Sequence, residues 1–221
     1  MFIPLRDENP SGKFPFVNVA LLLANLGVFV YEVTLVPRQY DLLVTKWGFI
    51  PLRITALLHG HGSIEAALLP LVTSMFLHTG FAHILGNTLF LWIFGDNVEA
   101  EFGHLRYLLF YLFCGVGAGL AHYAFNTHSH IPAVGASGAI SGIMGAYIVL
   151  EPRNRVLTLI LIFLVRVPAV IVLGVWFALQ FLSALAAQHQ PAVQMNGGVA
   201  VWAHIGGFLL GALVALAAKK R

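Results

Sequence analysis

The stretch AVGASGAISGIMGAY, Ala133 to Tyr147, places two serines among glycines and alanines in a chain that is otherwise apolar. Gly138, Gly142 and Ala146 recur at four-residue spacing. A ridge of small side chains at this spacing is the usual way in which membrane helices pack closely. Ser137 stands just before the ridge. The stretch therefore predicts a tightly packed helix that begins near a hydroxyl group.

The composition around this stretch indicates a membrane protein. Of the 221 residues, 59% are hydrophobic and 10% are charged, and the mean hydropathy of +0.85 is far above that of a soluble domain. The twelve Lys and Arg residues are scattered, so the formal charge of +3 predicts no nucleic-acid partner. Cys114 is the only cysteine, which excludes a disulfide framework and a thiolate metal site. The first thirteen residues lack a cleavage signature, and we expect no cleaved signal peptide.

Six apolar runs are long enough to cross a bilayer as helices, which takes about 20 residues. Two further runs, 66–77 and 156–165, are shorter and are interrupted by Pro70 and by Arg166–Pro168, so we expect them to be interfacial or half-inserted. No linker or repeat separates the runs, and the sequence predicts an all-α, six-helix membrane bundle in a single domain, residues 1–221. The six predicted spans are 16–36, 79–98, 105–125, 133–150, 168–187 and 198–217.

The basic residues predict the orientation of this bundle. Six spans place both termini on one side, and every Lys and Arg except Arg38, Lys46 and Arg53 then falls on that side. The positive-inside bias therefore predicts an N-in/C-in, multi-pass protein, which we expect in a prokaryotic cytoplasmic membrane. In this orientation the second, fourth and sixth spans begin at the outer face.

Four polar residues share one depth in this arrangement. Ser137 opens the fourth span, His204 lies near the start of the sixth in VAVWAHIGGFLLG, and His83 and Asn87 lie near the start of the second in FAHILGN. All four fall within about two helical turns of the outer face. Each alone is more often a hydrogen-bonded core residue. Because polar groups inside a membrane are costly, their shared depth favours a functional site.

The residue types at this depth are those of nucleophilic catalysis. A serine hydroxyl becomes a useful nucleophile when a base such as a neutral imidazole accepts its proton, and Ser137 with His204 fits this pairing. Asp96 and Glu99 lie about 20 Å deeper, too far to orient the histidine. We therefore expect a Ser-His dyad, with Glu32 as a remote candidate for a third member.

Acyl transfer also needs hydrogen-bond donors for the oxyanion. Pro132 suits the start of a helix, which would leave first-turn N–H groups around Ser137 free. Side-chain donors from His83 and Asn87 would complete the oxyanion site.

Three motifs resemble those of the rhomboid intramembrane serine proteases. GASGAISG resembles their Gly-x-Ser-Gly nucleophile motif, AHIGGFLLG their last helix with its histidine and Gly-xxx-Gly face, and HTGFAHILGN their second helix with its His-xxx-Asn pair. The similarity spans essentially the whole chain. It implies a compact six-helix core, a long first loop partly embedded in the lipid bilayer, and cleavage of transmembrane-protein substrates without a cofactor or metal.

The resemblance also implies roles for individual residues. It makes Ser137 the nucleophile and His204 the general base, assigns the oxyanion or substrate contacts to His83, Asn87 and Gly135, and matches His78 to an earlier histidine at the end of the first loop. Many family members have a tyrosine four residues after the nucleophile, where this chain has Ser141. Candidates to orient His204 are then Ser141, Trp202 and Phe81.

Other functions fit parts of the sequence. Intramembrane polar residues also line the pathways of small transporters and channels, but the spans show no inverted repeat. The pairs His59-x-His61 and His128-x-His130 suggest a membrane metalloenzyme, although HExxH is missing. A non-catalytic rhomboid-like binding protein is the third alternative.

Overall fold

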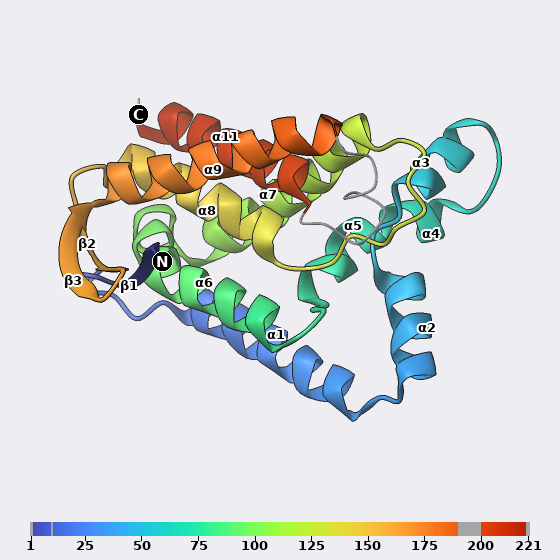
Figure 1. The fold of residues 1–221 in the computed structure, drawn as a ribbon, viewed down its shortest axis with the longest axis horizontal. Helices are drawn as coiled ribbons and strands as arrows, with labels where there is room; N and C mark the ends of the chain where they lie inside the picture. The colour runs from blue at the N-terminus through green and yellow to red at the C-terminus, as the bar shows by residue number, and fades with distance from the viewer. Residues whose placement is uncertain (1, 10, 190–199, 220–221) are drawn as a thin grey trace.

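Long apolar helices form the body of the molecule (Figure 1). The structure is a computed structural model that describes residues 2–9, 11–189 and 200–219. In chain order the long helices are α1 (Phe16–Thr34), α6 (Phe81–Phe102), α7 (His104–Phe125), α8 (Ser137–Leu150), α9 (Ala169–His189) and α11 (Val201–Lys219). The first two residues of the predicted span 198–217 lie outside the described residues.

The long segment between α1 and α6 contains short helices. They are α2 (Pro37–Trp47), α3 (Pro51–Leu58), α4 (Ile64–Leu68), α5 (Pro70–Thr73) and a 3₁₀ turn, Ser74–Phe76. Proline begins α2, α3 and α5, where its missing N–H and fixed φ suit a first helical position. The predicted short run 66–77 is therefore a chain of helical turns, too short to cross a membrane.

A three-stranded antiparallel sheet lies at the end of the molecule opposite α3 and α4 (Figure 1). Its strands are β1 (Phe2–Asp7), β2 (Arg155–Ile160) and β3 (Phe163–Pro168), with β2 in the centre. The all-α expectation is wrong here, since the run 156–165 belongs to a hairpin. Val156 and Thr158 are buried while their neighbours along the strand are not, which is the two-residue alternation of a half-buried strand. The partner β1 comes from the other end of the sequence.

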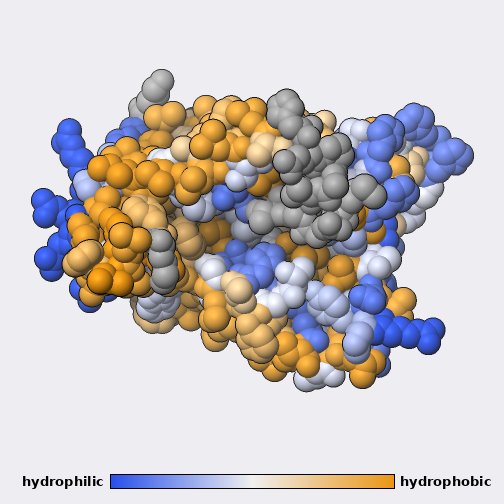
Figure 2. Space-filling model, in the orientation of Figure 1, coloured by the Kyte–Doolittle hydropathy of each residue, from blue (hydrophilic) through white to orange (hydrophobic). Residues whose placement is uncertain are grey.

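Four of the described helices, α1, α7, α9 and α11, are long and apolar enough to cross a membrane. Helix α6 meets the same test together with residues 64–76, from which it is bent by 80°, so the described part of the chain has up to five such spans. Helix α8 has only 14 residues, and the six-span count stays a prediction. Figure 2 shows apolar residues over much of one face, hydrophilic residues at both ends and a smaller hydrophilic patch near the middle. Apolar surface of this extent is expected of a membrane-embedded body.

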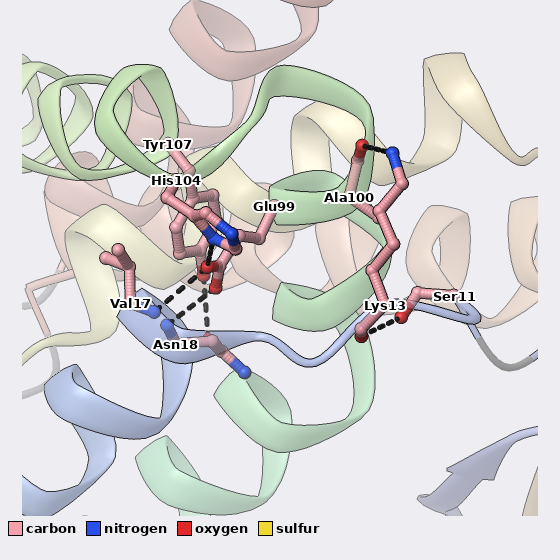
Figure 3. A network of polar contacts seen from close by, with 8 residues as sticks. All are labelled: Ser11, Lys13, Val17, Asn18, Glu99, Ala100, His104 and Tyr107. Carbon is pink, nitrogen blue, oxygen red and sulfur yellow. Dashed lines mark hydrogen bonds and ion pairs between the residues drawn. The ribbon is translucent and has the colours of Figure 1, made fainter.

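A buried carboxylate holds the start of α1 against α6 and α7 (Figure 3). Glu99, near the end of α6, accepts hydrogen bonds from the backbone N–H groups of Val17 and Asn18 at 2.9 and 2.7 Å, and it contacts His104 Nδ1 at 2.5 Å. The Tyr107 hydroxyl donates to Asn18 Oδ1 at 2.7 Å. A negative charge suits a helix N-terminus, where unpaired N–H groups gather. Glu99 thus joins three helices, and it does not take part in the serine site described below.

Candidate active site

The close packing of α8 against α11 brings the central residues of the site together. A Cβ atom at Gly207 would overlap the Gly138 carbonyl oxygen, and one at Gly211 would overlap that of Gly142. The two backbones therefore touch along glycine faces, as the small-residue spacing predicted. His204 lies on α11 one turn before Gly207, at the level where α8 begins.

Ser137 and His204 are in hydrogen-bonding contact. The distance from Ser137 Oγ to His204 Nε2 is 2.7 Å. His204 is buried, whereas Ser137 is only half-buried. The sequence analysis predicted that these two residues lie close together, and the structure places them so.

The second ring nitrogen of His204 contacts a residue that the sequence analysis missed. Oε1 of Gln180, in α9, lies 2.9 Å from His204 Nδ1. The centroid of the Trp176 ring lies 5.8 Å from that of the His204 imidazole. Gln180 is the only amide side chain in the predicted span 168–187. This isolated polar group inside an apolar run was the signal that could have identified it.

The residues expected to orient His204 have other contacts. Ser141 donates its hydroxyl hydrogen to the Ser137 carbonyl oxygen at 2.6 Å. Trp202 stacks on the Phe125 ring with centroids 3.7 Å apart, and Phe81 packs against Phe29 of α1.

Glu32, the remote third candidate, is engaged elsewhere as well. Its two carboxylate oxygens each accept the His78 backbone N–H at 3.1 Å. This bond ties α1 to the end of the first loop. His78 itself is almost fully buried, and its ring packs edge-on against that of His83 with centroids 5.1 Å apart.

The chain enters α8 through an extended segment, so the expected helix start at Pro132 is wrong. Ala133 forms an antiparallel bridge with Phe49, and the Gly135 N–H donates to the Ser74 carbonyl at 2.8 Å. Gly135 has φ of +121°, a conformation that side chains rarely permit. The helix begins only at Ser137. Its first-turn N–H groups have no acceptor within the helix.

His83 and Asn87 lie beside Gly135, two residues before Ser137. A Cβ atom at Gly135 would lie 2.6 Å from His83 Nε2 and 3.5 Å from Asn87 Nδ2. Asn87 Nδ2 is buried and has no hydrogen-bond partner among the described residues. The Thr79 N–H approaches His83 Nδ1 at 3.5 Å, and the Thr79 hydroxyl lies 3.1 Å from the same nitrogen. The four residues expected at one depth are thus grouped around the start of α8.

A cavity of about 40 Å³ adjoins Ser137. Its lining is mostly small, with Gly135, Gly138 and Ala203 next to the serine and His122 as an additional polar side chain. A cavity of this volume has room for a few water molecules or a small side chain. Within the described residues, no three His, Cys, Asp or Glu side chains come together as a group that could hold a metal ion.

The fold and these contacts define a multi-pass membrane protein with a serine-histidine pair between two closely packed helices. Comparison with known families gives a match to the Rhomboid domain over residues 65–221. The chain belongs to the rhomboid family.

Individual relatives share the family but differ in length. The chain is 42% identical over 85 residues to Rhomboid protease GluP of Bacillus subtilis, covering 38% of this chain and 16% of that protein. It is 36% identical over 78 residues to Putative rhomboid protease YdcA of the same organism, covering 35% and 39%. RHOMBOID-like protein 1 of Arabidopsis thaliana is 30% identical over 153 residues, covering 60% and 39%. The matches therefore span well under half the length of these relatives.

Proposed function

We propose that this protein is an intramembrane serine endopeptidase in which Ser137 is the nucleophile and His204 the general base. The observation that carries the proposal is the 2.7 Å contact between Ser137 Oγ and His204 Nε2, within reach of direct proton transfer. Two relatives are named as rhomboid proteases, one of them as putative.

The reaction follows from the placement of these two groups. His204 Nε2 accepts the hydroxyl proton while Ser137 Oγ attacks the carbonyl carbon of the scissile peptide. The same nitrogen then gives that proton to the departing amine, leaving an acyl-enzyme. A water molecule that is deprotonated by His204 hydrolyses the ester and regenerates Ser137.

The oxyanion formed in each half of the reaction would bind where His83 and Asn87 approach Gly135. The Ser137 N–H and Asn87 Nδ2 are two of the donors, and Asn87 is not committed to another bond among the described residues. The Thr79 N–H faces His83 Nδ1 at 3.5 Å, which favours the neutral tautomer with its proton on Nε2, the atom beside Gly135. Removal of one such donor lowers kcat about 100-fold to 1000-fold in comparable sites.

The substrates we propose are transmembrane proteins reached within the bilayer. A peptide bond in a regular helix is shielded by its own backbone, so residues that weaken the helix near the cut should favour cleavage. The small cavity beside Ser137 favours a small side chain next to the scissile bond. We expect an alanine at this position of a transmembrane reporter to be cleaved faster than a leucine or tryptophan, and equal rates would refute the assignment of the cavity.

The test is covalent labelling of purified protein in detergent with a fluorophosphonate, followed by peptide mapping. We expect the label on Ser137 and no label in Ser137→Ala, which should also lose cleavage of a transmembrane reporter. Ser183→Ala is the matched control, since among the described residues the Ser183 hydroxyl bonds to the Leu179 carbonyl of its own helix. Cleavage by Ser137→Ala would refute the proposal, and a folded wild type that neither labels nor cleaves would point to a non-catalytic relative.

We further propose a single membrane domain of six spans with both termini inside, in a prokaryotic cytoplasmic membrane. The C-terminal end of α11, which is at Lys219, and the strand β1 lie at one end of the bundle, and α3 and α4 lie at the other (Figure 1). The test is impermeant thiol labelling of intact cells. The reagent should modify protein that carries Cys114→Ala and His61→Cys, and it should leave protein that carries Cys114→Ala and Lys219→Cys unmodified.

A further inference from the structure

The hydrogen bond between Gln180 and His204 links the base to helix α9, which packs beside α11. Gln180 Oε1 lies 2.9 Å from His204 Nδ1, while Ser137 Oγ lies 2.7 Å from Nε2 of the same ring. The imidazole is thus held at both nitrogens by side chains from α9 and α8. Bonds on opposite ring nitrogens fix the orientation of the ring as well as its position.

The chemistry of the two contacts determines which nitrogen should hold the proton. In a neutral imidazole one nitrogen donates and the other accepts. An amide oxygen can only accept, so a ring bonded to Gln180 Oε1 carries its proton on Nδ1. Nε2 is then free to accept the proton of Ser137. This is the tautomer that general-base catalysis requires.

We propose that Gln180 is a positioning residue for the general base, with its neutral amide acting where soluble serine proteases use a carboxylate. This inference rests on the proposed function of Ser137 and His204. In this role Gln180 does not contact the substrate. Its role is to hold His204 in the productive tautomer and to stabilise the imidazolium as that cation forms.

A neutral amide suits this place in the molecule. Gln180 is half-buried in an apolar helix, where an ionised side chain would be costly. An amide accepts a hydrogen bond without bringing a charge into the bilayer. The other candidates do not contact Nδ1, since Ser141 bonds to the Ser137 carbonyl and Trp202 stacks on Phe125.

The experiment compares two substitutions at this position. Gln180→Leu keeps the approximate size and removes the acceptor, whereas Gln180→Glu keeps an acceptor at the same reach. We expect Gln180→Leu to lower kcat for a transmembrane reporter about 10-fold to 100-fold, with KM changed by less than about twofold, because the lost bond is strongest in the charged transition state. Gln180→Glu should retain more activity than Gln180→Leu. Ser183→Ala on the same helix should match the wild type.

The tautomer gives a readout that a merely structural role would not move. In protein labelled with ¹⁵N-histidine, with the signal assigned through His204→Ala, we expect the wild-type His204 proton on Nδ1 and a mixture of tautomers in Gln180→Leu. Protonation of His83 or His122 would also act on His204, so spectra are compared at one pH. The mixture should appear while the thermal unfolding of Gln180→Leu stays close to that of the wild type.

The outcomes separate this inference from the proposed function. Suppose that the fluorophosphonate labels Ser137 in the wild type. If Gln180→Leu then keeps the wild-type kcat, or if Nε2 of His204 carries the proton in the wild type, the positioning role is wrong and the protease assignment stands. If a folded wild type shows neither labelling nor cleavage, the proposed function fails and the role of Gln180 fails with it. A reduced kcat with an altered tautomer in Gln180→Leu, relieved in Gln180→Glu, supports the proposal.

Discussion

The contact between α8 and α11 makes a substitution at Gly207 the most informative perturbation of the site. An added Cβ atom at Gly207 overlaps the Gly138 carbonyl oxygen, and an ordinary carbon-oxygen contact is about 3.3 Å or longer. Backbone cannot swing aside as a side chain can, so the helices must separate by about 1 Å at this point. The gap from Ser137 Oγ to His204 Nε2 would then grow from 2.7 Å to about 3.7 Å, beyond a hydrogen bond.

Gly207→Ala should therefore lose activity far more than stability. A misplacement of about 1 Å can lower a rate about 100-fold, while overpacking at one site costs about 1–3 kcal/mol. The assay is the rate of fluorophosphonate labelling of Ser137, with thermal unfolding in the same detergent. Gly174→Ala on α9 is the matched control, because a Cβ atom there meets nothing within 4 Å. Wild-type labelling by a folded Gly207→Ala protein would refute the argument that the glycine contact sets the distance between the two residues.

Three further predictions concern the rest of the fold. Glu99→Gln should lower the free energy of unfolding by about 2–3 kcal/mol, since an amide has one oxygen where the carboxylate has two, which accept from the Val17 and Asn18 N–H groups. An unchanged denaturation midpoint would contradict this. Burial raises the pKa of Asp7 above 3.8, against a smaller opposing effect of its bond from Tyr147. The stability that this group contributes should be present below pH 3.8 and be lost as the pH rises through the raised pKa, and in Asp7→Asn this part of the pH dependence of unfolding should disappear. Ile162, 82% exposed at the tip of the hairpin, should lie in the interface, so Ile162→Trp fluorescence should be quenched by brominated lipids; full quenching by aqueous iodide instead would place the tip in water.

Much of the site followed from residue type and depth. Ser137, His204, His83 and Asn87 are polar groups in apolar runs, and hydrocarbon penalises such groups strongly enough that their positions are informative without a structure. The glycine spacing likewise indicated which helices approach closely. The sequence analysis was wrong where contacts are made across long separations. Strand β1 pairs with β2, which lies about 150 positions away in the sequence. The hydrophobic period of a short segment does not show which distant strand it pairs with.

The sequence by itself indicated a membrane protein and predicted one shared depth for a hydroxyl, two imidazoles and a carboxamide, because hydropathy and helical rise are local properties that add up along the chain. Only the tertiary structure decided which of these groups touch. In that structure Nδ1 of His204 contacts Gln180, and the Ser141 hydroxyl bonds to the Ser137 carbonyl of its own helix. Helix α8 starts at Ser137, after Gly135 with its positive φ. Those choices depend on differences of about 1 Å between packed helices, and such differences arise from the fit of distant side chains, which no single segment contains.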